Sequence, residues 1–281
     1  MSVFIRYPGG KTKAFTTSWD DGASEDIRLV QLMREYGIKG TFNLNSAMFG
    51  DFFELDGMHF RNLTLQQVKQ LYIPNGMEVA VHGALHRELS AESDQTVLWE
   101  LISDRKALEQ IADCPVHGMA YPYGRYNDRT MDIAGSLGIK YARTIRENRD
   151  FSLPENWMEF SVTCHFGDRD AVSLIRRFLN EQPERDAFFG GIWGHSYEIQ
   201  QLDAWEEVAE LFAMVSGKND IWHATAAEIF NYTKAYRSLD YTFDDRFCRN
   251  PSAVDVWLKY NDEITVIPSG ATVNLPQKRT E

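Results

Sequence analysis

The chain has 281 residues, 43% of them hydrophobic and 25% charged, which is typical of a globular protein. Its formal net charge of −12 argues against a nucleic-acid partner or an anionic membrane surface. No apolar run is long enough to cross a bilayer, and the N-terminal MSVFIRYPGG has no stretch typical of a signal peptide. We therefore expect a cytoplasmic protein with no nucleic-acid or membrane partner.

Short strand-like runs alternate with helical patterns from residue 14 to about residue 238. The runs, in chain order, are AFTTSW (14–19), GTFNL (40–44), MEVAVH (77–82), HGMAY (117–121), KYARTI (140–145), EFSVTC (159–164), AFFGGIW (187–193) and DIWHAT (220–225). Between the first two lies a helical stretch that Ser24 and Gly37 could cap. This alternation predicts parallel strands joined by crossover helices. The fold class is therefore α/β, and the eight strand candidates favour a closed or nearly closed (β/α) barrel over residues 1–238.

The pattern changes after Tyr232. Residues 253–275 alternate apolar and polar positions around an Asn261–Asp262 turn, which predicts an antiparallel hairpin followed by a short strand. Such a hairpin is too small to fold alone. We therefore expect residues 239–281 to form a C-terminal β extension that packs on the barrel.

Polar residues stand where the predicted strands end, and this is the edge of a (β/α) barrel that carries active sites. Asp20 and Asp21 follow the first strand, His82 ends the third, and His86 comes four residues later. His195 follows the seventh strand. The fourth and sixth strand ends carry Tyr121, Pro122, Tyr123 and His165.

His82 and His86 are spaced i and i+4, which in a helical turn puts both imidazoles on one face, within reach of one metal ion. One carboxylate of the Asp20–Asp21 pair would complete three ligands and leave open positions, as in catalytic zinc sites. The other carboxylate, kept ionised by the cation, could take a proton from water. Such a set suits one divalent ion, with Zn²⁺ first and Co²⁺, Ni²⁺ or Fe²⁺ as alternatives. A solvated Asp-Asp-Gly turn with two structural histidines is the other interpretation.

Four stretches taken together resemble the successive motifs of a known family. TSWDDG, HGALH, YPYG and WGH, in this order, are similar to the motifs of the polysaccharide deacetylases (carbohydrate esterase family four). That family includes chitin, peptidoglycan and poly-N-acetylglucosamine deacetylases. The resemblance covers residues 13–232 and implies a distorted (β/α) barrel with seven or eight strands. It also implies a metal-dependent hydrolase that removes an acetyl group from an N-acetylated amino sugar or saccharide.

The resemblance also implies a role for each motif residue. Asp20 would be the catalytic base, and His195 the general acid toward the leaving amine. Tyr123 would offer its backbone N–H to the oxyanion. The metal ligands would be Asp21, His82 and His86.

The chain departs from the family pattern at two places. Many members carry an Arg two residues before the proline of the third motif, where this chain has Ala120. Arg143, at the end of the fifth strand, is the candidate replacement, with a surface ion pair as the alternative. The Asp that orients the acid histidine has no clear match, and Asp150 is the best guess from sequence order.

We expect the substrate to meet a set of aromatic and polar residues around the rim. These are Tyr121, Pro122, Tyr123, Trp157, His165 and Tyr197. Trp193, in the middle of a strand, is expected to pack in the core instead.

Two other functions stay open at this point. One is a related hydrolase that opens a cyclic amide, and the other is a catalytically silent saccharide-binding protein. The sequence also leaves open the sugar and its chain length, the acyl group, the native metal and the role of the C-terminal hairpin. A homo-oligomer is equally open.

Overall fold

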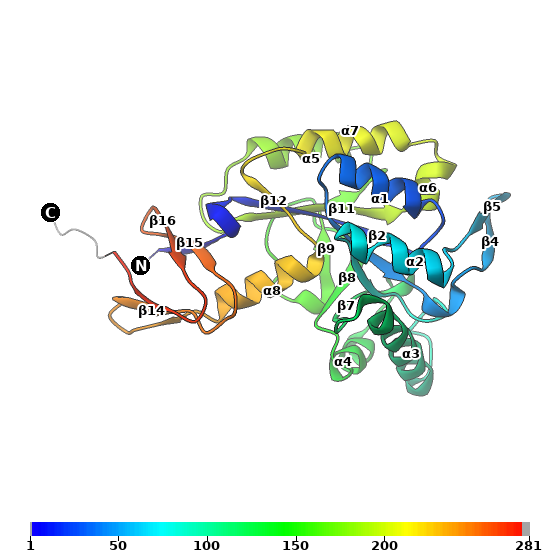
Figure 1. Cartoon of the computed structure of the whole chain (residues 1–281), viewed down its shortest axis with the longest axis horizontal. Coiled ribbons are helices and arrows are strands. Elements are labelled where there is room, and N and C mark those ends of the chain that lie inside the picture. The colour runs from blue at the N-terminus through cyan, green and yellow to red at the C-terminus, as the bar shows by residue number, and fades with distance from the viewer. Residues whose placement is uncertain (1, 277–281) are drawn as a thin grey trace.

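A curved sheet of parallel strands forms the centre of the molecule in this computed structural model, which describes residues 2–276 (Figure 1). The strands are hydrogen-bonded in the order β10-β11-β2-β3-β6-β7-β8-β9, and β12 also pairs with β2. Their bounds are β2 Lys13–Asp20, β3 Gly40–Leu44, β6 Glu78–Val81, β7 Gly118–Ala120, β8 Tyr141–Glu147, β9 Phe160–Val162, β10 Cys164–His165, β11 Phe188–His195 and β12 Ile221–His223. Each of the eight predicted runs overlaps at least one of these strands.

The sheet curls toward closure between its two end strands. Strands β9 and β10 are separated only by Thr163, yet they lie at opposite ends of the hydrogen-bonding order. Thr163 joins the two ends, because its N–H donates to the Gly191 carbonyl at 3.0 Å and its Oγ1 accepts from the Gly191 N–H at 3.2 Å. The predicted distorted (β/α) barrel is therefore confirmed, as a parallel sheet whose strand ladder does not close.

Helices surround the sheet (Figure 1). They are α1 Asp26–Glu35, α2 Leu65–Leu71, α3 Asp94–Ala112, α4 Asp128–Ser136, α5 Ala171–Asn180, α6 Ser196–Gln201, α7 Trp205–Val215 and α8 Ala226–Arg237. Short 3₁₀ turns occur at η1 Pro8–Gly10, η2 Ser46–Met48, η3 Ile73–Asn75, η4 Pro122–Gly124 and η5 Trp157–Glu159. Ser24 does not cap α1 as expected, because Glu25 occupies the N-cap and Ser24 Oγ bonds to the Glu25 carboxylate.

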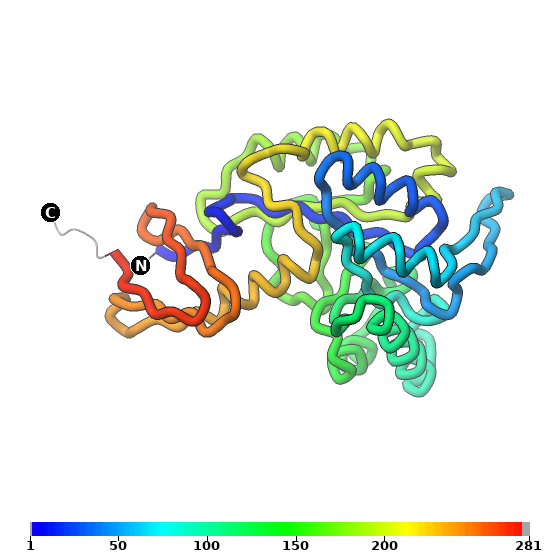
Figure 2. The backbone as a smooth tube through the Cα atoms, in the orientation of Figure 1, coloured from blue at the N-terminus to red at the C-terminus, as the bar shows by residue number. Residues whose placement is uncertain are grey.

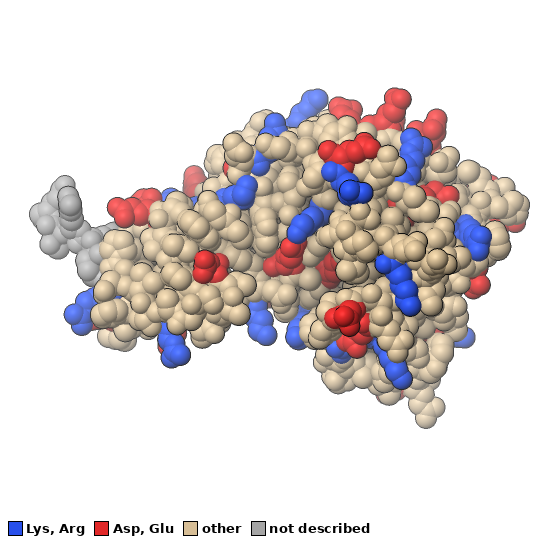
Figure 3. Space-filling model, in the orientation of Figure 1, with Lys and Arg blue, Asp and Glu red and all other residues tan. Residues whose placement is uncertain are grey.

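Among residues 2–276, no helix combines the length and the apolar character that crossing a membrane requires. On the face shown in Figure 3, acidic and basic side chains are interspersed rather than gathered into one basic patch. The expected cytoplasmic location and the expected absence of nucleic-acid and membrane partners stay predictions.

The C-terminal extension contains the predicted hairpin. Strands β15 Val256–Tyr260 and β16 Glu263–Ile267 pair antiparallel around Asn261 and Asp262, whose φ angles of 46° and 72° suit a tight hairpin turn. A second small sheet combines β13 Asp240–Tyr241, β14 Phe247–Arg249 and β17 Thr272–Asn274. The last five residues of the expected extension, 277–281, lie outside the described part of the chain.

One strand of this extension comes from the other end of the chain. Strand β1 Val3–Arg6 pairs antiparallel with β15, and the N-terminal trace runs beside the C-terminal strands in Figure 2. The boundary between residues 1–238 and 239–281 stays a prediction, and β1 forms its sheet across it.

A further hairpin, β4 Phe52–Leu55 and β5 Met58–Arg61, projects beside α6 (Figure 1). The sequence analysis did not predict it. Its turn is Asp56–Gly57, with φ angles of 49° and 78°, a dipeptide that favours two-residue hairpins.

Candidate active site

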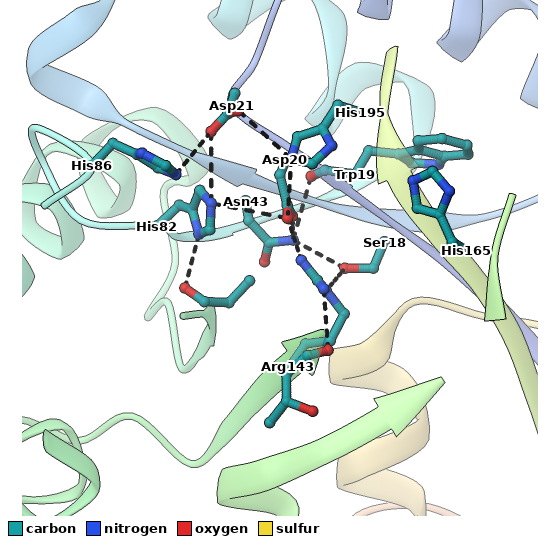
Figure 4. Close-up of polar contacts among 12 residues, drawn as sticks. Ser18, Trp19, Asp20, Asp21, Asn43, His82, His86, Arg143, His165 and His195 are labelled. Carbon is teal, nitrogen blue, oxygen red and sulfur yellow. Dashed lines mark hydrogen bonds and ion pairs between the residues drawn. The ribbon is translucent and has the colours of Figure 1, made fainter. Parts of the chain in front are cut away.

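The carboxyl ends of neighbouring strands bring the motif residues together (Figure 4). Strands β11, β2 and β3 run parallel in a register that pairs His195 with Asp20, and Asp20 with Asn43. Residues far apart in sequence therefore end at the same level of the sheet. His82 follows the end of β6, the next strand along.

Asp20 is only 3% exposed, and both of its carboxylate oxygens are held. Asn43 Nδ2 donates to Oδ1 at 2.8 Å, and the Arg143 guanidinium donates to Oδ2. Burial alone would raise the pKa of Asp20. The charge and hydrogen bond of Arg143, with smaller contributions from His82 and His195, outweigh burial and lower that pKa to about 2. Asp20 is therefore an ionised acceptor with a fixed orientation.

Arg143 reaches Asp20 from the interior of the sheet. It is 1% exposed, its Nε donates to Ser18 Oγ at 2.9 Å, and its guanidinium lies 4.7 Å from the centroid of the Trp193 ring. The alternative of a surface ion pair is therefore wrong. In the β7–β8 ladder Arg143 is the register partner of Ala120, so a guanidinium stands one strand away from the position where many relatives carry theirs.

Three side chains each direct one possible ligand atom toward a point that could hold a metal ion. Asp21 Oδ1 lies 3.6 Å from His82 Nε2 and 3.5 Å from His86 Nε2. This oxygen is buried and has no hydrogen-bond partner among the described residues, an arrangement that is costly unless something binds there. His82 Nδ1 lies 2.8 Å from the Ala120 carbonyl oxygen, which can only accept, so the lone pair of Nε2 faces Asp21. Burial lowers the pKa of both histidines to about 4 and keeps them in the neutral form that ligates metals. These residues fit a divalent cation.

The two histidines lie in a loop and not on a helix, which differs from the expectation drawn from their spacing. His86 has a φ of 53°, and its N–H donates to the Gly83 carbonyl at 3.3 Å. Two buried carboxylates of α3 hold this loop. Asp104 accepts from the His82 N–H at 2.9 Å, and Glu100 accepts from the Leu85 N–H at 2.8 Å.

His195 is oriented by a carboxylate that the sequence analysis missed. Its Nδ1 lies 2.8 Å from Glu198 Oε2, which leaves Nε2 facing the carboxylates of Asp20 and Asp21 at 3.9 and 3.8 Å. Burial opposes the protonated imidazole, but the hydrogen bond to Glu198 and the charges of the two aspartates raise the pKa of His195 to about 9. His195 is therefore poised to carry a proton.

Glu198 also contacts His165, whose Nε2 lies 3.1 Å from the same oxygen. Glu198 lies in the N-terminal turn of α6, where it also accepts from the His195 N–H, whereas His165 reaches it from β10. Asp150, which sequence order suggested for this role, bonds to the Ser152 N–H and lines a different cavity. The suggestion of Asp150 is therefore wrong.

A cleft of about 280 Å³ opens over these groups. It is lined by Asp20, Asp21, His82, His86, Tyr121, Tyr123, Gly124, Ile145, Trp193, His195 and Tyr197. Tyr123, with a φ of 57°, places its ring 4.4 Å from that of His86. The Tyr197 hydroxyl donates to Asp21 Oδ2 at 3.2 Å.

The structure reverses the expected places of two tryptophans. Trp157 is 6% exposed and packs against Phe160, Phe189 and Phe230, so the expected substrate contact is wrong. Trp193, expected in the core, lines the cleft.

Two other expected contact residues are also set back from the cleft. Pro122 is buried beneath its turn. Tyr121 directs its hydroxyl to the Met158 carbonyl at 2.8 Å, and only part of it borders the cleft. The roles assigned to the individual site residues stay predictions.

A parallel (β/α) barrel with carboxylates and histidines gathered at the carboxyl ends of its strands has its polar groups where enzymes of this architecture place their active sites. Comparison with known proteins gives the particular family. A family model described as polysaccharide deacetylase matches residues 5–142, so the chain is similar to this family over about half of its length. The recognition made from the four motifs is confirmed.

Individual relatives are distant. YxkH of Bacillus subtilis (strain 168), whose name places it among the polysaccharide deacetylases, is 24% identical over 133 residues, which is 47% of this chain and 44% of that protein. The chain thus matches less than half the length of this curated relative.

Two solved structures show the same fold. A Mycobacterium smegmatis protein named as a polysaccharide deacetylase superposes with a TM-score of 0.60 at 18% identity, over 84% of this chain and 96% of that one. The Xyl-CE4 domain of a multidomain xylanase from the hindgut metagenome of Trinervitermes trinervoides gives 0.50 at 16% identity, over 79% and 92%.

Proposed function

We propose that this protein is a metal-dependent hydrolase that removes the acetyl group from an N-acetylated amino sugar of a saccharide. One observation carries the proposal within the family. A buried, ionised Asp20 fixed by Arg143 stands beside Asp21, whose unpartnered oxygen faces two neutral histidines. One carboxylate is thus held by protein groups, while its neighbour has room for a cation.

One divalent ion, Zn²⁺ in the first place, would be held by Asp21, His82 and His86. When bound, it supplies an electrophile that polarises the acyl carbonyl and makes water more acidic. Asp20 takes the proton of the attacking water, because Asn43 and Arg143 fix its carboxylate toward the cleft.

The remaining groups act on the two ends of the breaking bond. The Tyr123 N–H faces the oxygen on which negative charge develops. His195, protonated at Nε2 and bonded through Nδ1 to Glu198, gives its proton to the departing amine. A protein that only binds saccharide requires neither the Asp20–Arg143 pair nor the His195–Glu198 pair.

Two adjacent substitutions test this division of roles. Asp21→Asn should lose metal, because a neutral amide is a poorer ligand than a carboxylate. Asp20→Asn should keep metal and lose turnover by about 100- to 10,000-fold, the usual contribution of a positioned base. Metal content of the purified variants and acetate release from N-acetylated saccharides are the measurements.

The two variants serve as controls for each other, since each removes one charge from neighbouring positions. Loss of metal in Asp20→Asn, or near-normal turnover in both variants, would contradict the proposal. Opening of a cyclic amide without acetate release would assign the site to the related cyclic amide hydrolases.

A further inference from the structure

His165 lies beside the proposed general acid, on the neighbouring strand. Strands β10 and β11 run parallel, and their register pairs His165 with Trp193, two residues before His195. Alternate residues of a strand face the same side of a sheet, so these three side chains share one face. The His165 and Trp193 rings meet edge-on with centroids 4.8 Å apart, and the Trp193 and His195 rings at 6.0 Å. His165 is nevertheless outside the set of described residues that line the catalytic cleft.

The tautomer of His165 is set by the turn that follows β10. The Gly167 N–H donates to His165 Nδ1 at 3.2 Å, so this nitrogen is an acceptor. In a neutral imidazole the other nitrogen then carries the proton. Nε2 lies 3.1 Å from Glu198 Oε2, and His165 therefore donates to this carboxylate. Protein groups occupy both ring nitrogens, which leaves neither of them for a substrate.

The backbone around His165 holds the ring in this place. Its own N–H donates to Glu147 Oε1 at 3.0 Å. On the facing strand, a Cβ at Gly194 would lie only 2.9 Å from His165 Nε2, so any larger residue there would displace the imidazole. Strand β11 thus leaves room for the ring that reaches over from β10.

Glu198 needs such a support. Its side chain is 29% exposed, and a glutamate in partial contact with solvent keeps several rotamers unless bonds fix it. Its Oε2 accepts from His195 Nδ1 at 2.8 Å and from the His195 N–H at 3.2 Å. Both of these donors belong to the residue that Glu198 has to orient. His165 supplies a donor from a different strand, which anchors the carboxylate independently of His195.

The same three side chains have ligand atoms close enough together for a metal ion. A ligating imidazole must offer a lone pair. Nε2 of His165 carries a proton instead, because Nδ1 is held as an acceptor by the Gly167 N–H. The geometry therefore favours hydrogen bonds over a second ion.

We propose that His165 is a positioning residue of the reaction: its Nε2–H fixes Glu198, and Glu198 directs Nε2 of His195 toward the leaving amine. The proposal rests on the proposed function, in which His195 is the acid. An amide nitrogen must be protonated to leave, whereas p-nitrophenolate leaves an ester as a stable anion. Loss of the acid's orientation should therefore slow cleavage of an amide and spare an activated ester.

The test compares His165→Asn with His165→Gln. The amide nitrogen of Gln extends about as far as Nε2 of histidine, whereas that of Asn extends only as far as Nδ1. His117→Asn is the matched control, because His117 is also part-buried and has Nδ1 2.9 Å from a backbone carbonyl, that of Gly138. It directly precedes β7, at the amino end of that strand and away from the cleft. The two probes are the β-1,4-linked disaccharide of N-acetylglucosamine and p-nitrophenyl acetate, with zinc content measured in each preparation.

We expect His165→Asn to lower kcat for the disaccharide about tenfold with KM unchanged, which is part of the 100- to 10,000-fold that a positioned acid contributes. Its hydrolysis of p-nitrophenyl acetate should stay normal. His165→Gln should recover most of the lost kcat. His117→Asn should match the unmodified protein on both probes.

Proton NMR of the zinc-loaded protein reads the same positioning without turnover. The Nδ1–H of His195, bonded to a carboxylate, should give a sharp downfield resonance that is absent from His195→Gln. It should broaden in His165→Asn, because a mobile Glu198 lets this proton exchange with water, and stay sharp in His165→Gln.

An equal loss on the two probes would overturn the proposal, because His165 would then support the site as a whole. A rise in KM with unchanged kcat, or no recovery in His165→Gln, would also overturn it. So would a second zinc ion per chain that His165→Asn removes. If the unmodified protein releases no acetate from N-acetylated saccharides, the proposed function fails, and the resonance in the two variants still decides whether His165 positions Glu198.

Discussion

Replacing Glu198 by Gln should move the basic limb of the pH–rate profile to lower pH. Glu198 Oε2 lies 2.8 Å from His195 Nδ1, and its hydrogen bond is the largest influence that raises the pKa of His195. That pKa of about 9, against an ordinary 6.5, corresponds to about 3 kcal/mol in favour of the protonated imidazole. Asp20 and Asp21 also raise this pKa through their charges, and they remain in the variant.

The sign follows from the role of His195 as an acid. An acid is active while protonated, so activity falls as pH rises through its pKa. In Glu198→Gln the amide oxygen can still accept from Nδ1, but the charge that stabilises the imidazolium is gone. We expect the basic limb to move down by about one pH unit or more, which is about tenfold lower activity on that limb.

The assay is kcat/KM for acetate release between pH 6 and pH 10, with metal content measured in each preparation. Glu206→Gln is the matched control, because Glu206 is an exposed carboxylate in the first turn of α7 and lies outside the cleft. A basic limb that stays in place in Glu198→Gln would refute the assigned proton role. If the basic limb moved equally in Glu206→Gln, the effect would come from the change in net charge alone and not from the bond to His195.

Three further substitutions probe groups around the site. Burial raises the pKa of Asp26 to about 7, so the folded state loses stability as pH rises from about 4 to 7. Asp26→Asn lacks this loss, so its stability relative to the unmodified protein should increase by about 2 kcal/mol between pH 5 and pH 8 in thermal unfolding. A difference in stability that stays constant with pH would contradict the shift. Asp104→Asn removes one acceptor from the loop that carries His82 and should weaken metal binding by about tenfold in a chelator competition, while unchanged affinity would make Asp104 purely structural. Arg143→Lys keeps the charge but loses the planar fork, and should lower kcat by about 100-fold with metal retained; normal kcat would show that Asp20 needs only a nearby cation.

The strands could be predicted because each is a short apolar run between helical stretches, and the site could be predicted because polar residues follow those runs. Asp20 and His195 are register partners on neighbouring strands, which is the consequence of both standing at a strand end. Parallel pairing turns a position along each strand into proximity in space.

Other features of the fold and the site were missed, because they depend on three-dimensional packing or on local patterns with more than one interpretation. Trp157 lies in the η5 turn, where it packs among aromatic rings, and Trp193 lies near the end of β11, where it lines the cleft; the sequence pattern alone does not fix which side of the sheet each one reaches. Glu198 has the spacing of an ordinary helix-capping residue, so its bond to His195 was hidden within a common pattern. The β4–β5 hairpin did carry a local signal, the Asp56–Gly57 dipeptide between apolar residues, which went unused.

The pairing of β1 with β15 has a consequence for how the chain folds. On a ribosome β1 emerges before any barrel strand, whereas β15 emerges after α8, so β1 lacks its partner strand while the barrel forms and contacts the segment before β11, through the bonds of Ile5 with Asp186 and Ala187. Pairs this distant in sequence form late, because the loop-closure entropy is lost before the contact is made. A folding intermediate with a formed barrel and an open small sheet is therefore expected, with β15 free along one edge. Only the turn at Pro8–Gly10 and three further residues separate β1 from β2, the strand that ends in Asp20. Completion of this small sheet would then add a late constraint at the amino end of that central strand, which already pairs with β11 and β12.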